Sequence, residues 1–225
     1  MLWSPNTRLL YPFENTALDY SGNARHGTVF GSGVYATKPN GGRCLYFDGV
    51  GDYVATPSFG LSGSVVVFAA DVRCKFSSTV GGIFLSDNGA DPGVGLLRYF
   101  RVVNTNTLRW RYSNGAVVTG EDATDFFAAP YEDVWLNAVI VCDYAGKKCY
   151  FYRKGVLFSV SGTMTGTPLF PSTTNQKYVG WYTTNQFLTT GYLANVQLWT
   201  LATMPAAGQM LANVNRLMLG MNPIW

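Results

Sequence analysis

Short runs in which apolar and polar residues alternate recur along most of the chain, and turns rich in glycine separate them. The clearest example, 134–162, predicts strands at 134–142, 149–153 and 156–160, joined by the turns DYAGKK and KG. A period of two residues is the pattern of a strand with one buried face. The chain is therefore expected to be built mainly from β-strands.

A second group of strands is expected on the same ground. In RCLYFDG (43–49), Leu45 and Phe47 share one face, and GDYVATP (51–57) follows a glycine turn as the expected hairpin partner. We expect 81–89 to pair with 93–103 and 107–115 to be followed by 116–122. The remaining predicted strands are 64–76, 177–183 and 191–200.

The spacing of these strands predicts the fold class. They follow one another about every 8–15 residues with almost no helical periodicity between them, as in an all-β, two-sheet antiparallel sandwich or jelly roll. The exception is 204–220, which begins near Pro205 and ends at Gly220 like a helix. Its apolar residues at helical spacing are Met210, Leu211, Val214, Leu217 and Met218. We expect a sandwich over 1–203, then a short helix and an apolar tail over 204–225.

Composition argues against nucleic acid as a partner. Charged residues make up 13% of the chain, about half the usual share, and the net charge is only +3. Arginines do interleave with aromatic residues over 98–112, but a half-exposed hairpin with solvated arginines explains that pattern. A weakly charged surface rich in aromatic residues and glycine suits carbohydrate contacts and assemblies better.

We also expect no membrane partner and no export by a cleaved signal. Residues 1–12 lack a basic start followed by an apolar run, and no stretch approaches the length of about 18 apolar residues that spans a bilayer. Synthesis in the cytoplasm follows as an expectation.

The four cysteines have no metal-binding spacing. Cys142 and Cys149 flank the turn DYAGKK, so they could face each other across a hairpin, either as a disulfide or as buried free thiols. Synthesis without a leader favours free thiols.

Four blocks that occur in order over residues 11–203 resemble a known family. They are YPFENTALDYSGNARHGTV, GGRCLYFDGVGDYVATP, VWLNAVIVCDYAGKKCYFYRKG and YVGWYTTNQFLTTGYLANVQLWTLA. Their order is similar to the laminin-G-like branch of the concanavalin A-like lectin and glucanase folds. The resemblance implies two antiparallel sheets of about six or seven strands each, packed face to face.

The C-terminal segment adds a second resemblance. A helix after the last strand, followed by NP and an aromatic end, looks like the tails of laminin-G-like proteins encoded by bacteriophages and prophages. This implies a non-enzymatic structural or adhesive virion protein, a capsid decoration or fibre component made in the host cytoplasm. Its partners would be capsid or tail subunits, further copies of itself and host-surface polysaccharide. A free-standing carbohydrate-binding lectin is the alternative.

The polar opening segment, 13–33, admits a metal site or an ordered loop. Asp19, Ser21 and Asn23 are short side chains that can hydrogen-bond to their own backbone and lead the chain into a strand near Gly27. Members of this fold often hold Ca²⁺, and Asp19 with Asn23 is then the leading pair. Weaker candidates for Ca²⁺ are Asp48, Asp52, Asp87, Asn88 and Asp91. No other cofactor is expected.

The chain is not expected to be an enzyme. Related glucanases resemble E-x-D-x-x-E on one strand, whereas Glu121, Asp122 and Asp125 in GEDATDF do not share the parity that one strand face requires. The single histidine, His26, stands beside a glycine turn and is expected to be structural.

Sugar binding is the function that the sequence favours. Aromatic rings stack on sugar faces, and loops on a rigid sandwich can present them. The candidate residues, from the segment 180–187, are Trp181, Tyr182, Asn185 and Gln186. The apolar tail would be unusual if left in water and is expected to contact a partner. Its candidate interface residues are Met221, Pro223, Ile224 and Trp225.

Overall fold

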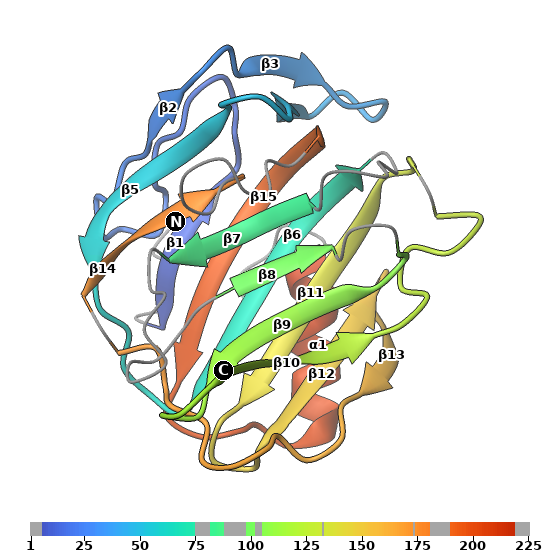
Figure 1. The fold of residues 1–225 in the computed structure, drawn as a ribbon. Coiled ribbons are helices and arrows are strands. Elements are labelled where there is room, and N and C mark those ends of the chain that lie inside the picture. Colours follow the sequence, from blue (N-terminus) through green and yellow to red (C-terminus); the bar gives the residue numbers. More distant parts are fainter. Residues whose placement is uncertain are drawn as a thin grey trace.

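The chain folds as two antiparallel sheets packed face to face (Figure 1). The computed structural model describes residues 6–74, 82–87, 98–101, 105–131, 133–172, 174–180 and 190–218. The eight-stranded sheet contains, in spatial order, β13 (Val156–Val160), β12 (Lys148–Arg153), β11 (Leu136–Asp143), β6 (Val65–Cys74), β15 (Thr190–Leu201), β4 (Arg43–Asp48) and β3 (Val34–Thr37). Its eighth strand, β1 (Thr7–Tyr11), pairs with the second half of β15.

The seven-stranded sheet lies in front of the eight-stranded sheet in Figure 1. Its strands, in spatial order, are β10 (Val118–Ala123), β9 (Leu108–Ser113), β8 (Arg98–Arg101), β7 (Gly82–Asp87), β14 (Asn175–Val179), β5 (Tyr53–Phe59) and β2 (Thr28–Phe30). The predicted all-β sandwich is therefore confirmed. Within the described part of the chain, no helix has the length and apolarity needed to cross a membrane.

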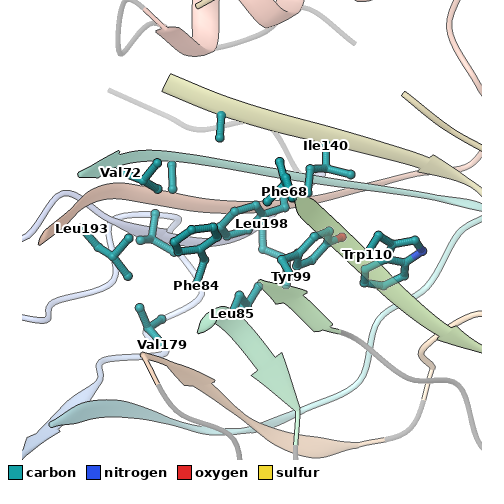
Figure 2. Packing of buried hydrophobic residues seen from close by; sticks show 14 of the residues in the cluster. Phe68, Val72, Phe84, Leu85, Tyr99, Trp110, Ile140, Val179, Leu193 and Leu198 are labelled. Carbon is teal, nitrogen blue, oxygen red and sulfur yellow. The ribbon is translucent and has the colours of Figure 1, made fainter. Parts of the chain in front are cut away.

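The main core fills the space between the sheets. Figure 2 shows Phe68 from one sheet against Tyr99 from the other, with Trp110 on the far side of Tyr99. Their rings form a stacked column, with centroids 4.6 Å apart for Phe68 and Tyr99 and 4.5 Å apart for Tyr99 and Trp110. All three side chains are fully buried. Such aromatic stacks add to the stabilisation from burial and hold the two sheets together.

A single described helix, α1 (Ala207–Met218), covers part of the outer face of the eight-stranded sheet, the face turned away from the other sheet (Figure 1). Met210 and Val214 are buried in a second cluster with apolar residues of that face, such as Val67. The predicted helix is confirmed, and it packs on its own sandwich. Leu211, which the spacing placed in the apolar set, is 43% exposed.

Most of the predicted strand pairings are found. Strands β11, β12 and β13 form the expected meander, and β7 pairs with β8 and β9 with β10. Cys142 and Cys149 lie directly opposite each other in β11 and β12, and both are buried free thiols. The turn after β12 is also as expected, with positive φ at Lys154 and Gly155.

The predicted hairpin between the segments that form β4 and β5 is wrong. β4 lies in the eight-stranded sheet and β5 in the seven-stranded sheet, so the turn between them carries the chain from one sheet to the other. Gly49 and Gly51 adopt positive φ of 87° and 85° there, and the Asp52 carboxylate accepts a hydrogen bond from the Asp48 backbone N–H at 3.0 Å. Alternation shows which face of a strand is buried, but not which sheet the strand joins.

Candidate functional site

Two of the predicted site sets lie outside the described residues. The structure gives no placement for 181–189, and so for the predicted sugar-binding residues Trp181, Tyr182, Asn185 and Gln186. The same holds for 219–225, which contains the predicted interface residues Met221, Pro223, Ile224 and Trp225. Both sets stay predictions.

Asp19 organises the opening loop through hydrogen bonds. Its carboxylate accepts from the backbone N–H groups of Leu10 (3.0 Å), Ser21 (2.9 Å) and Arg25 (2.9 Å), and from the Ser21 hydroxyl (2.7 Å). Asn23 donates from its side-chain amide to the carbonyl of Thr7 at 2.9 Å. The predicted capping of this loop by its own short side chains is therefore found.

His26 has the structural role that its position beside a glycine turn predicted. Its Nδ1 accepts a hydrogen bond from the Asp19 backbone N–H at 3.1 Å. Among the described residues, no cluster of three or more His, Cys, Asp or Glu side chains could hold a metal ion. Calcium at Asp19 and Asn23 stays a prediction.

The carboxylates considered for catalysis point to different environments. Asp122 pairs with Arg109, whose Nη2 lies 2.6 Å from Oδ2, on the exposed side of β10. Glu121 faces the other way and accepts a hydrogen bond from the Tyr112 hydroxyl at 3.2 Å. Burial raises the pKa of Glu121. The strand parity thus separates these two acids, and Asp125 lies in the following turn with a positive φ of 61°.

A pocket of about 390 Å³ opens on the outer face of the eight-stranded sheet. We call it the outer pocket. It is lined by Lys38, Pro39, Asn40, Asp71, Trp135, Leu136, Asn137 and Lys154. These residues come from the β3–β4 turn, from β6, from the start of β11 and from the β12–β13 turn. Its size is at the lower end of the range for small-molecule sites.

Asp71 is the polar centre of the outer pocket. It accepts hydrogen bonds from Lys38 Nζ (3.1 Å), Asn137 Nδ2 (3.1 Å) and Asn195 Nδ2 (2.6 Å). The strands place these groups together, because Asn137 and Ala194 both lie opposite Asp71 in the register of the sheet. Asn137 Oδ1 is buried and has no partner among the described residues, so one acceptor of the pocket wall is left unsatisfied.

An irregularity in β15 brings the third donor to Asp71. The register between β15 and β6 shifts between Ala194 and Gln197, and Asn195 adopts a positive φ of 49° there. A bulge of this kind re-aims a side chain that regular alternation would place elsewhere. Here it turns the amide of Asn195 toward the Asp71 carboxylate.

Aromatic rings extend beside this polar centre. Trp135 is partly exposed, and its ring lies 6.0 Å from that of Tyr192, which lies 4.9 Å from Tyr46. Lys38 Nζ is 5.7 Å from the Trp135 ring centroid, and the Arg73 guanidinium is 5.4 Å from that of Tyr192. These contacts lie within the range of cation–π attraction, so they help to hold the rings in place.

Sequence reasoning missed this site, although one signal was present. The signal lies in the predicted strand over 64–76. Its outward positions are apolar at Val65, Val67 and Ala69 and then change to Asp71 and Arg73. Charges at alternating positions late in an apolar strand mark the point where its outer face is no longer covered.

The chain is similar to known proteins in its three-dimensional structure. No protein-family model matches the chain, and no curated protein sequence does. Domain 4 of the GH43 extracellular arabinanase AbnA from Geobacillus stearothermophilus, solved with arabinotriose, is similar at a TM-score of 0.70 and 15% identity. That likeness covers 95% of this chain and 98% of the arabinanase domain.

Clostridial toxin domains have the same fold over part of their length. The binding domain of Paraclostridial Mosquitocidal Protein 1 matches 95% of this chain at a TM-score of 0.69 and 11% identity. The botulinum neurotoxin serotype C1 binding domain matches 94% at 0.67 and 11%. The chain spans about half of each toxin domain, 52% in both cases. At these identities the likeness shows the fold alone, a two-sheet antiparallel β-sandwich.

Proposed function

We propose that this chain is a non-enzymatic carbohydrate-binding domain, and that the outer pocket holds the sugar. The observation that carries the proposal is the partly exposed Trp135 ring beside the hydrogen-bonded cluster around Asp71. An indole face can stack on the apolar face of a pyranose or furanose ring. Amide and carboxylate groups at its edge can then bind the sugar hydroxyls and fix the orientation.

The cluster is suited to this role because its groups are already held in place. Asp71 keeps three donors in fixed positions, so little side-chain freedom is lost when a ligand binds. Asn137 Oδ1 is buried without a partner among the described residues, so a small movement of this amide on binding would let a sugar hydroxyl reach it and relieve the cost of leaving it unpaired. Sugars present many such hydroxyls.

The same residues argue for binding without cleavage. Glycoside hydrolysis uses two carboxyl groups, about 5–9.5 Å apart, that flank the scissile bond. Asp71 is the one carboxylate among the described residues that line the outer pocket, and three donors already engage it. Related folds support the assignment: the arabinanase domain was solved with arabinotriose, and botulinum neurotoxin type C interacts with two ganglioside molecules.

The experiment is a screen of the purified chain against immobilised glycans, followed by calorimetric titration of the best ligand. We expect Trp135→Ala to weaken binding about tenfold or more, since a lost aromatic contact is worth about 1.4 kcal/mol. Tyr20→Ala is the matched control, because Tyr20 is 50% exposed and does not line the pocket. Loss of binding in Trp181→Ala but not in Trp135→Ala would move the site to the segment predicted from sequence.

We further propose that the domain is a component of a bacteriophage virion. Displayed on a particle as a capsid decoration or fibre component, the domain would attach it to host-surface polysaccharide. The resemblance of the C-terminal segment to the tails of phage-encoded laminin-G-like proteins supports this role. Co-purification of the chain with assembled particles tests it, and a chain found only as a free lectin would contradict it.

A further inference from the structure

The charges around the outer pocket do not balance. Among the described residues, two lysines, Lys38 and Lys154, and one carboxylate, Asp71, line it. Lys38 and Asp71 form an ion pair at 3.1 Å, and their side chains are only 11% and 19% exposed. Asp71 therefore compensates Lys38, and the positive charge of Lys154 is left over on the pocket wall.

The neighbouring cation, Arg73, has a carboxylate partner, whereas Lys154 does not within the described residues. Arg73 lies against the Tyr192 ring and pairs with Asp133 at 3.1 Å. Lys154 forms no ion pair within the described residues, and its Nζ lies 4.7 Å from the Tyr131 ring centroid. Among the described residues of this wall, Lys154 is therefore the cation without an ion pair.

The backbone of Lys154 is held in place beside the outer pocket. Lys154 begins the β12–β13 turn with a positive φ of 49°, and its N–H donates to the carbonyl of Asn137 at 3.0 Å. Asn137 itself lines the pocket and binds Asp71. Lys154 is thus tied to the residue that carries the sugar-binding amide, while its exposed side chain can reach into the opening.

We infer that the sugar bound in the outer pocket is acidic, a uronic or sialic acid residue whose carboxylate pairs with the Lys154 ammonium. This inference rests on the proposed function of the pocket. The ring of such a sugar stacks on Trp135, its hydroxyls meet the cluster around Asp71, and its carboxylate receives a charge-assisted hydrogen bond. The net charge of +3 acts in the same direction, because it favours approach of an anionic glycan.

The test compares acidic probes with neutral partners of the same ring structure. Trigalacturonic acid is paired with its methyl ester and sialyllactose with the methyl ester of its sialic acid carboxylate, and the full chain is titrated by calorimetry at low and high salt. We expect the acidic member of at least one pair to bind about three- to tenfold more tightly, with the preference shrinking as salt rises. Lys154→Gln is expected to remove that preference.

Lys148→Gln is the matched control. Lys148 is exposed like Lys154, but it lies at the start of β12, the end of the strand away from the β12–β13 turn, and does not line the pocket. The control loses the same charge and is expected to keep the preference for the acidic probe. Equal unfolding midpoints in urea show that both variants are folded.

The outcomes separate this inference from the proposed function. If neither pair shows a preference for its acidic member, or if Lys154→Gln keeps the preference, the inference is overturned. Should neutral glycans still bind in a manner that depends on Trp135, the proposed function stands. If no glycan binds at all, both fall.

Discussion

Replacing Asp19 by alanine removes the acceptor at the centre of the opening loop. Asp19 is only 7% exposed, and its carboxylate accepts three backbone hydrogen bonds and one from a hydroxyl. Two of the backbone donors, the N–H groups of Leu10 and Ser21, belong to buried residues. Arg25 is partly exposed, so water can reach the third. The substitution therefore leaves two buried donors without partners.

The expected loss follows from those two donors. Each buried N–H left unsatisfied costs about 1–3 kcal/mol, so the two together are expected to lower the free energy of unfolding of Asp19→Ala by about 2–6 kcal/mol. Asp19→Asn keeps one acceptor for Leu10 and Ser21 but turns its NH₂ toward the Arg25 N–H, so about 1–2 kcal/mol should be lost. The loss expected for Asp19→Ala is a large fraction of the free energy of unfolding of a typical domain.

Urea unfolding followed by tryptophan fluorescence measures both values. Asp122→Ala is the control with the same change in charge, because its ion pair with Arg109 is exposed and should contribute less than about 1 kcal/mol. A loss below about 1 kcal/mol for Asp19→Ala would refute the argument that these hydrogen bonds hold the loop.

The same assay separates the structural role of Asp19 from a role as a calcium ligand. A ligand that binds only the folded state raises its stability. We expect equal unfolding free energies in excess calcium and in excess EDTA. Stabilisation of the wild type by calcium, absent in Asp19→Asn, would instead support the metal site predicted from sequence.

Two further predictions concern buried ionisable groups. Burial raises the pKa of both Cys142 and Cys149. We therefore expect their thiols to react with an aromatic disulfide reagent far more slowly in the native protein than after unfolding in urea. Rapid labelling of the native protein would contradict this. Burial lowers the pKa of Lys177 from 10.5 to about 8, so between these values the unfolded chain binds more protons and stability rises with pH. The Lys177→Met variant lacks this rise, so its stability relative to wild type should change by about 3 kcal/mol between pH 7 and pH 11. A difference independent of pH would show that Lys177 is not desolvated.

Much of the fold was predictable because side-chain alternation reports directly on burial. The meander of β11 to β13 follows from one uninterrupted pattern with two short turns, and its strands pair with neighbours in the sequence. The prediction of a hairpin between β4 and β5 was wrong because alternation does not report which sheet a strand joins. Each strand buries alternate residues whichever sheet it joins, so the choice of sheet depends on partners far away, β15 for β4 and β14 for β5.

By itself, the sequence determined most of the strands, which faces of those strands are buried, and that Asp19 and its neighbours cap a loop. These features depend on residues close in the chain, where propensity and local hydrogen bonding act. Strands β1 and β3 were not predicted. Only the tertiary structure decided that Asp71, Asn137 and Asn195 meet. Their contact depends on the register of three strands and a bulge, and no local pattern encodes the spacing between residues 66 and 124 positions apart.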